Sequence, residues 1–214
     1  MKKLIMAAVI ASLIGACGSK KPENVDVAIT APVVPEAVSP EPLDVFTLSV
    51  MDFSKCKGSS SAALSPARKK LLAKQIARIL DEIGGAREVK ETFVLLMCIE
   101  SRFRPDAKSG AGAMGISQVM PETGKGVAKE IGLGEISKDD LLDPEINIRL
   151  GYSYFLGLVK EFGGNFAKAA AGYNSGPASS SVKAMGYLGQ GHPETGWYVG
   201  NLYNLKEELR LAQK

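Results

Sequence analysis

One carboxylate, Glu100, stands at the end of an apolar run that fills residues 93–99. A carboxyl group at the end of a buried helix is partly desolvated, and desolvation raises its pKa because it penalises the charged form. A glutamic acid that keeps its proton near neutral pH can donate it to a leaving oxygen. The glycines that follow (Gly110, Gly112 and Gly115) let the backbone pass close to a ligand, where a Cβ would collide. The segment predicts an acid facing a cleft; the alternative is a surface glutamate before an ordinary turn.

Three separated motifs extend this interpretation. Residues 100–121 read ESRFRPDAKSGAGAMGISQVMP, residues 171–177 read AGYNSGP, and residues 193–201 read PETGWYVGN. In order and spacing they resemble the soluble lytic transglycosylase (SLT) domain, which is similar to goose-type lysozyme. The resemblance covers roughly residues 85–205.

The resemblance implies an all-α, lysozyme-like fold and the glycan of peptidoglycan as substrate. It implies non-hydrolytic cleavage of the β-1,4 bond between N-acetylmuramic acid and N-acetylglucosamine, which leaves a 1,6-anhydro-muramic acid end. Glu100 carries over as the sole catalytic group, first as acid and then as base. Such a mechanism departs from the usual pair of carboxylates in glycoside cleavage.

The first motif also suggests substrate contacts. Ser109 and Gln118 match family positions that line the sugar sites, and Gln118 can hydrogen-bond an acetamido or hydroxyl group. Met120 is expected to form an apolar wall of the cleft, with core packing as the alternative.

The second and third motifs add residues from further along the chain. The resemblance implies that the hydroxyl of Tyr173 orients Glu100 or the substrate, and that Asn174 contacts sugar or supports its loop. The alternative for both is a structural role, with Tyr173 capping the core. Glu194 matches an acidic position across the groove; alternatively, it is a helix-start carboxylate favoured by the helix dipole. Tyr198 and Trp197 either flank sugar rings or pack the last helix, and packing is the favoured interpretation for Trp197.

The elements that must position these side chains are predicted to be helices. Ser65 and Asp143 are N-cap residues, each followed by proline at the first helical position, and Gly84 ends the first of these two helices. The run at 93–99 is apolar nearly all round, as expected of a central buried helix. The predicted helices cover residues 66–83, 87–101, a short stretch after 121, 143–162, 165–175 and 193–212. No convincing period-2 strand appears, so the predicted fold class is all-α.

The N-terminus reads as a lipoprotein signal. Residues 1–16 have two lysines followed by an apolar run that is too short to span a bilayer. The sequence before Cys17 resembles a bacterial lipobox, which implies lipid on Cys17, a periplasmic location and, since Gly18 is not aspartate, outer-membrane anchoring. Residues 17–45 are predicted to be a disordered, proline-rich and acidic linker, and residues 46–214 the catalytic domain. A plain secreted protein with a free thiol at Cys17 is the alternative.

Charge and cysteine usage limit the partners. Without Lys2 and Lys3, 24 basic residues face 23 acidic ones, a net charge of +1, which gives no electrostatic case for nucleic acid. Cys56 and Cys98 can form a disulfide in an oxidising compartment or remain as two thiols. The sequence supports no metal site and no cofactor, because its single histidine and these cysteines lack ligand spacing.

Two other functions remain open at this stage. A goose-type lysozyme would hydrolyse the same bond with water. A catalytically silent lipoprotein would only bind peptidoglycan and attach the membrane to the wall.

Overall fold

The computed structural model describes residues 41–56, 64–185 and 193–212. The regular secondary structure of these residues is helical, apart from two isolated β-bridges, so the predicted all-α fold is confirmed. All of them fall within one compact unit, Pro40–Lys214. The elements are α1 (Leu43–Asp52), α2 (Pro66–Ile83), α3 (Arg87–Ser101), α4 (Pro121–Glu130), the 3-10 helix η1 (Asp139–Leu142), α5 (Pro144–Glu161), α6 (Phe166–Ser175), α7 (Ser180–Ala184) and α8 (Pro193–Ala212).

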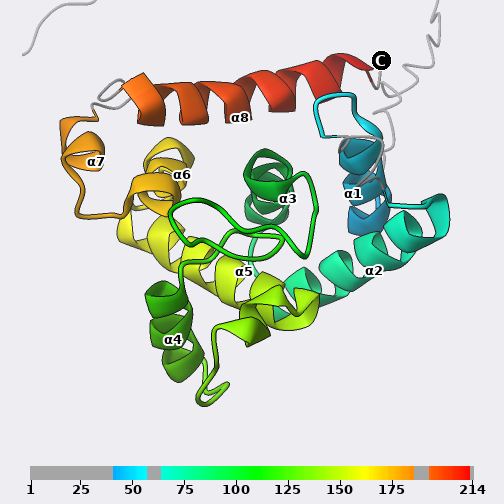
Figure 1. Ribbon diagram of the computed structural model, residues 1–214. Coiled ribbons are helices and arrows are strands. Elements are labelled where there is room, and N and C mark those ends of the chain that lie inside the picture. The colour runs from blue at the N-terminus through cyan, green and yellow to red at the C-terminus, as the bar shows by residue number, and fades with distance from the viewer. Residues whose placement is uncertain (1–40, 57–63, 186–192, 213–214) are drawn as a thin grey trace, which may run out of the picture. The chain divides into compact units, whose positions relative to one another are not determined.

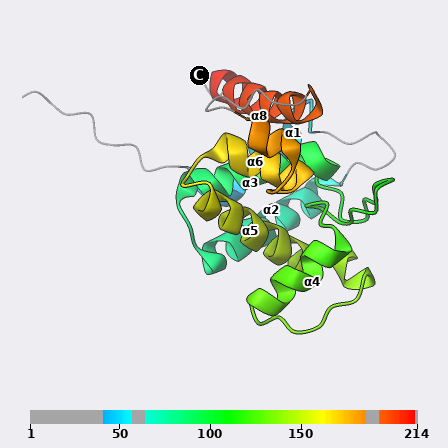
Figure 2. The ribbon, with the colours of Figure 1, turned by 90° about the vertical axis from the view of Figure 1, so that its left-hand side faces the viewer.

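Helix α3 occupies the centre of the unit. Its residues 92–98 are all buried, as the unbroken apolar run predicts. It packs against α1, α5 and α8. Figures 1 and 2 both show α8 crossing α3 and α6 on the side opposite α5. The C-terminal end of α3, where Glu100 lies, therefore reaches the seam between α3 and α8.

The two long helices α2 and α5 begin as their capping residues predict. Ser65 accepts a hydrogen bond from the amide of Arg68, and Asp143 accepts one from the amide of Ile146. Each satisfies one of the amides that a helix start leaves without a partner. Helix α5 lies along α2, α4 and α6 and so connects both ends of the unit.

Helix α1 is a correction to the predicted organisation. The predicted linker ran to residue 45 and no helix was expected before Ser65, yet α1 begins at Leu43. Its buried stripe of Leu43, Thr47, Val50 and Met51 faces the core, where α1 packs on α2 and α3. A helix this short is stabilised mainly by tertiary packing rather than by its own propensity, so the local sequence gave little warning. The signal segment, Cys17 and the linker before residue 41 lie outside the described residues.

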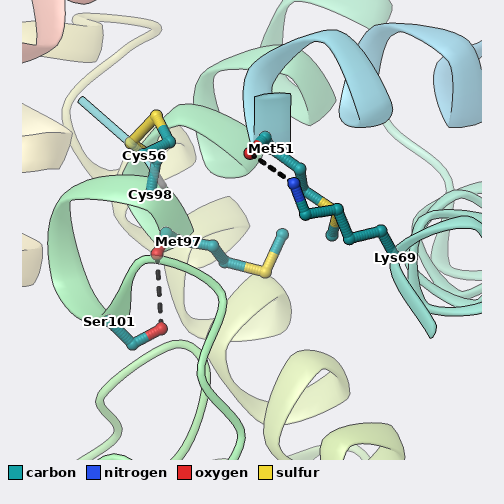
Figure 3. Close-up of a disulfide and its surroundings, with 6 residues drawn as sticks. All are labelled: Met51, Cys56, Lys69, Met97, Cys98 and Ser101. Atoms are coloured by element: carbon teal, nitrogen blue, oxygen red, sulfur yellow. Dashed lines mark hydrogen bonds between the residues drawn. A yellow bond between two sulfur atoms is a disulfide. The ribbon is translucent and has the colours of Figure 1, made fainter. Parts of the chain in front are cut away.

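A disulfide joins α3 to the segment that follows α1. Cys56 and Cys98 are bonded with a Cα–Cα distance of 5.2 Å (Figure 3). The bond closes a loop across a sequence separation of 42, which corresponds to about 4 kcal/mol of stabilisation in the chain-entropy account. Because Cys98 lies two residues before Glu100, this bond fixes the N-terminal segment to the helix that carries the acid. Among the described helices, none is long and apolar enough to cross a membrane.

Candidate active site

Among the acidic residues that the structure describes, Glu100 is the one whose pKa is raised. It lies in the last turn of α3 and is only partly exposed. Burial raises the pKa of Glu100 to about 7, while a hydrogen bond from Tyr198 opposes that rise. The C-terminal end of a helix also carries partial negative charge, which disfavours a second negative charge there. Near neutral pH the group therefore exists in both its protonated and its ionised form.

This pKa has a consequence for stability. Glu100 has a folded-state pKa of about 7, above the ordinary value of 4.5 that applies in the unfolded chain. The protonated form is therefore favoured by folding, so the associated stability is full below pH 4.5 and is lost as pH rises through 7. The shift corresponds to a cost of about 3 kcal/mol at most for the ionised form. The protein keeps this carboxyl at the expense of alkaline stability.

Tyr198 is the direct partner of Glu100. Its hydroxyl, on α8, donates a hydrogen bond of 2.5 Å to Oε1 of Glu100. Tyr198 is only 4% exposed, and burial together with the nearby carboxylate holds its pKa well above 10. It therefore stays protonated and can donate to Glu100 throughout the physiological range. From the sequence, Tyr198 was expected either to contact sugar or to pack the last helix. Its hydrogen bond to Glu100, 98 residues away, was not predicted.

The segment after α3 is held in an unusual backbone path. Arg102 and Phe103 both adopt left-handed conformations, with φ of 54° and 59°. Gly115 also has positive φ, and a Cβ there would lie 2.2 Å from the carbonyl oxygen of Leu141. Gly115 is thus required because its backbone passes close to Leu141 and Asn147. The sequence-based expectation was a close approach to a ligand instead.

Asn147, on α5, fixes the backbone of this segment through side-chain hydrogen bonds. Its Nδ2 donates to the carbonyl oxygens of Met114 and Leu141, and its Oδ1 accepts from the amide of Ser117 at 2.7 Å. At the other end, the hydroxyl of Ser101 donates to the carbonyl oxygen of Ile116 at 2.6 Å. Asn147 was not singled out from the sequence. The available signal was its position on the buried face of α5, where a polar residue needs partners.

Tyr173 supports the same segment. Its hydroxyl donates to the carbonyl oxygen of Ser117 at 2.8 Å, and its ring packs edge-on against Phe93 and Phe155. The hydrogen bond to Glu100 comes from Tyr198, so Tyr173 positions the loop around the acid. Asn174, the next residue, is exposed at the end of α6.

The predicted contacts from the first motif lie on this loop. Ser109 is exposed and its Oγ accepts from the amide of Ala113. Gln118 has φ of 51° and its Nε2 donates to the carbonyl oxygens of Ala107 and Gly115, so this amide braces the loop. Met120 is 43% exposed, which favours the apolar wall over core packing.

The third motif forms the beginning of α8. Glu194 lies in its first turn, and the side chain is outside the described part of the structure. The prediction that Trp197 packs the last helix is wrong, because this side chain is 66% exposed. Helix α8 turns Tyr198, Val199 and Leu202 toward the core, and Trp197 falls about 100° away from Tyr198 around the helix axis.

A helical fold around one buried acid, with no strands among the described residues, is the lysozyme-like class of architecture. Residues 82–186 match the transglycosylase SLT domain. This segment is thus similar to the SLT domain of lytic transglycosylases.

Individual relatives agree with this assignment. The chain is 37% identical over 95 residues to the soluble lytic murein transglycosylase of Escherichia coli K12, covering 44% of this chain and 15% of the relative. It is 43% identical over 77 residues to membrane-bound lytic murein transglycosylase C of Mannheimia succiniciproducens, covering 35% of this chain and 22% of the relative. The structure of lytic transglycosylase Slt from Pseudomonas aeruginosa superposes with a TM-score of 0.56 and 27% identity, covering 65% of this chain and 24% of that one. The matched segment is therefore a small part of each relative.

The Tyr198–Glu100 contact can be tested through the pKa of the acid. Tyr198→Phe removes the hydrogen bond that lowers this pKa, so we expect the pKa of Glu100 to rise above about 7. A carbon-13 NMR titration of the Glu100 carboxyl measures it. Tyr173→Phe is the matched control, since that hydroxyl bonds Ser117 instead. An unchanged or lowered pKa in Tyr198→Phe would show that the bond does not stabilise the carboxylate.

Proposed function

We propose that this protein is a peptidoglycan lytic transglycosylase that cleaves the N-acetylmuramic acid–β-1,4–N-acetylglucosamine bond and leaves 1,6-anhydro-muramic acid ends. The observation that carries the proposal is the Glu100 carboxyl, which has a pKa of about 7 and accepts a hydrogen bond from Tyr198. It lies beside the loop that follows α3. The SLT match and the named functions of the relatives support the substrate class.

The chemistry needs one group that acts twice. Protonated Glu100 donates its proton to the glycosidic oxygen, and the bond from that oxygen to the muramic acid C1 breaks. The carboxylate that results then takes the proton of the muramic acid C6 hydroxyl while O6 attacks C1. The acid is regenerated and no water enters the product. A pKa near the working pH suits both steps, because neither protonation state is strongly favoured.

Tyr198 is suited to the ionised state of Glu100, which follows proton donation. Its hydroxyl donates to Oε1, so it stabilises the carboxylate that forms when the proton leaves. Because the tyrosine itself stays protonated, it cannot compete with Glu100 for the substrate proton. Around this pair, we propose that Ser109, Gln118 and Met120 contact the sugars, with Asn174 and Glu194 at the edges of the groove.

A hydrolytic reaction would need a second carboxylate, either to activate water or to attack directly. The next acidic residues along the chain after Glu100 are Asp106 and Glu122. Both are exposed, and the carboxylate of Glu122 pairs with Lys125. Within the described residues, the hydrogen bond to Glu100 comes from a tyrosine and not from a second acid.

The acid assignment is tested by substitution. Glu100→Gln keeps the shape and removes the proton, so we expect turnover of purified peptidoglycan to fall by roughly 10²–10⁴-fold while the fold and glycan binding persist. Asp106→Asn and Glu122→Gln are the matched controls and should retain most activity. Release of soluble muropeptides measures all three. Full activity in Glu100→Gln, or a comparable loss in either control, would refute a single-acid mechanism.

We also propose that residues 1–16 are a lipoprotein signal and that Cys17 carries the lipid, with anchoring to the outer membrane and the domain in the periplasm. The lipobox-like context of Cys17 and the presence of membrane-bound enzymes among the relatives support this. A proline-rich segment of about 25 residues would separate the lipid from α1. An extended polyproline chain of that length reaches roughly 80 Å. The domain would therefore reach glycan strands some distance from the membrane surface.

The anchor is tested at Cys17. Cys17→Ala should leave the precursor without lipid, and the protein should leave the membrane fraction for the soluble fraction. Detergent partitioning of the variant measures this against the wild-type chain. Unchanged partitioning would refute lipid attachment at Cys17.

A further inference from the structure

A pocket lies on the seam between α3 and α8, at the end of α3 that carries Glu100. Its volume is about 220 Å³. Ile99 and Arg102 line it from the end of α3, Trp197 and Asn201 from α8, and Lys55 from the segment after α1. A whole small-molecule ligand usually occupies roughly 300–1,000 Å³, so this pocket suits one part of a larger ligand.

Chain geometry places the pocket next to the site of cleavage. Ile99 directly precedes Glu100, and Trp197 directly precedes Tyr198, the donor to Glu100. Consecutive helical residues point about 100° apart. On α8 the pocket lies within about 100° of Tyr198, whereas on α3 the lining residues Ile99 and Cys98 point about 100° and 160° away from Glu100. The pocket therefore lies on a neighbouring face of α3, where a flexible part of a substrate bound at Glu100 can reach it.

The pocket offers a cation that forms no ion pair within the described part of the chain. Arg102 is exposed, and no carboxylate pairs with it among the described residues. It adopts the left-handed conformation that caps α3, a position where glycine or asparagine would be less strained. Its neighbour Phe103 is also left-handed, but the buried ring of Phe103 packs into the core. Arg102 has no such packing role.

Lys55 adds a second positive charge to the pocket. Its Nζ pairs with the carboxylate of Glu208 at 2.5 Å, while the two side chains remain 59% and 39% exposed. Exposed pairs of this kind contribute little and exchange readily. Lys55 directly precedes Cys56, and the bond between Cys56 and Cys98 (Figure 3) attaches this segment to α3. Lys55 therefore comes from outside the SLT match at 82–186.

Trp197 and Asn201 complete the surface. The exposed indole of Trp197 presents a flat apolar face, and one turn further along α8 Asn201 presents an amide that can both donate and accept. Two cations, an aromatic face and an amide are suited to a peptide that carries a carboxylate. A glycan strand is neutral along its sugars, whereas muramic acid bears a peptide stem with free carboxylates.

We propose that this pocket binds a carboxylate of the peptide stem on the muramic acid unit, with Arg102 as its main cation. The inference rests on the proposed peptidoglycan substrate and adds the stem to what the chain recognises. Arg102 would engage the carboxylate in a bidentate pair, Lys55 would contribute long-range attraction, and Trp197 would contact the apolar parts of the stem.

The chain provides its own probe for this test. Trp197 is the single tryptophan of the sequence and lies in the pocket, so intrinsic fluorescence reports binding there without any turnover. A synthetic stem tetrapeptide with free carboxylates should change the fluorescence of the wild-type protein saturably. Arg102→Gln should weaken this binding roughly tenfold, and Glu208→Gln, which releases Lys55, should tighten it. The same tetrapeptide with amidated carboxyls should bind no better to wild type than to Arg102→Gln.

Arg68→Gln removes the same charge from an exposed position on α2 and is the matched control, expected to bind like wild type. Equal affinities for Arg102→Gln and wild type would overturn the proposal. So would a fluorescence response to stem-free glycan and none to the tetrapeptide, because the pocket would then be a sugar site. Since the readout needs no cleavage, its failure leaves the assay of Glu100→Gln to decide the proposed enzymatic function separately.

Discussion

The rest of this structure depends on the partial burial of one carboxyl group. Glu100 must be desolvated enough to keep a proton near neutral pH, yet it must remain open to a substrate. An amphipathic surface helix would leave such a group fully hydrated. Helix α3 is instead apolar almost all round, and α1, α5 and α8 cover it, so only its last turn meets the seam where Glu100 lies.

Holding an acid in this state requires a rigid surround. Tyr198 fixes the carboxyl from α8, while Asn147, Ser101 and Tyr173 bind the backbone of the loop that passes beside it. These contacts act on backbone carbonyls and amides, so the loop keeps its path independently of most of its own side chains. The disulfide adds a covalent tie two residues before the acid, in a domain that gives up alkaline stability to bury it.

Local patterns predicted much of the fold. The caps Ser65 and Asp143, the apolar run of α3 and the placement of Glu100 depend on neighbours in sequence, and each agrees with the structure. Contacts between residues that are distant in the sequence were harder to predict. The bond from Tyr198 to Glu100 spans 98 positions, and nothing near Tyr198 in sequence indicates its partner.

The other misses have the same cause. Asn147 reads as an ordinary polar residue until α5 is placed under the loop, and α1 forms a helix because the core covers its buried stripe. Trp197 was expected to pack the last helix, but the rotation of α8 that buries Tyr198 leaves Trp197 exposed. Fold class follows from local patterning, whereas the orientation of side chains at the site follows from the packing of whole helices.

The central claim is that Glu100 alone serves as acid and then base, with the substrate's own C6 hydroxyl in place of water. Digestion of peptidoglycan in oxygen-18 water, followed by mass spectrometry of the muropeptides, tests this most directly. We predict muramic acid ends that are lighter than hydrolysed ends by one water and carry no oxygen-18. Oxygen-18 at the new muramic acid end would contradict the account, because water would then have attacked C1 and the protein would be a lysozyme.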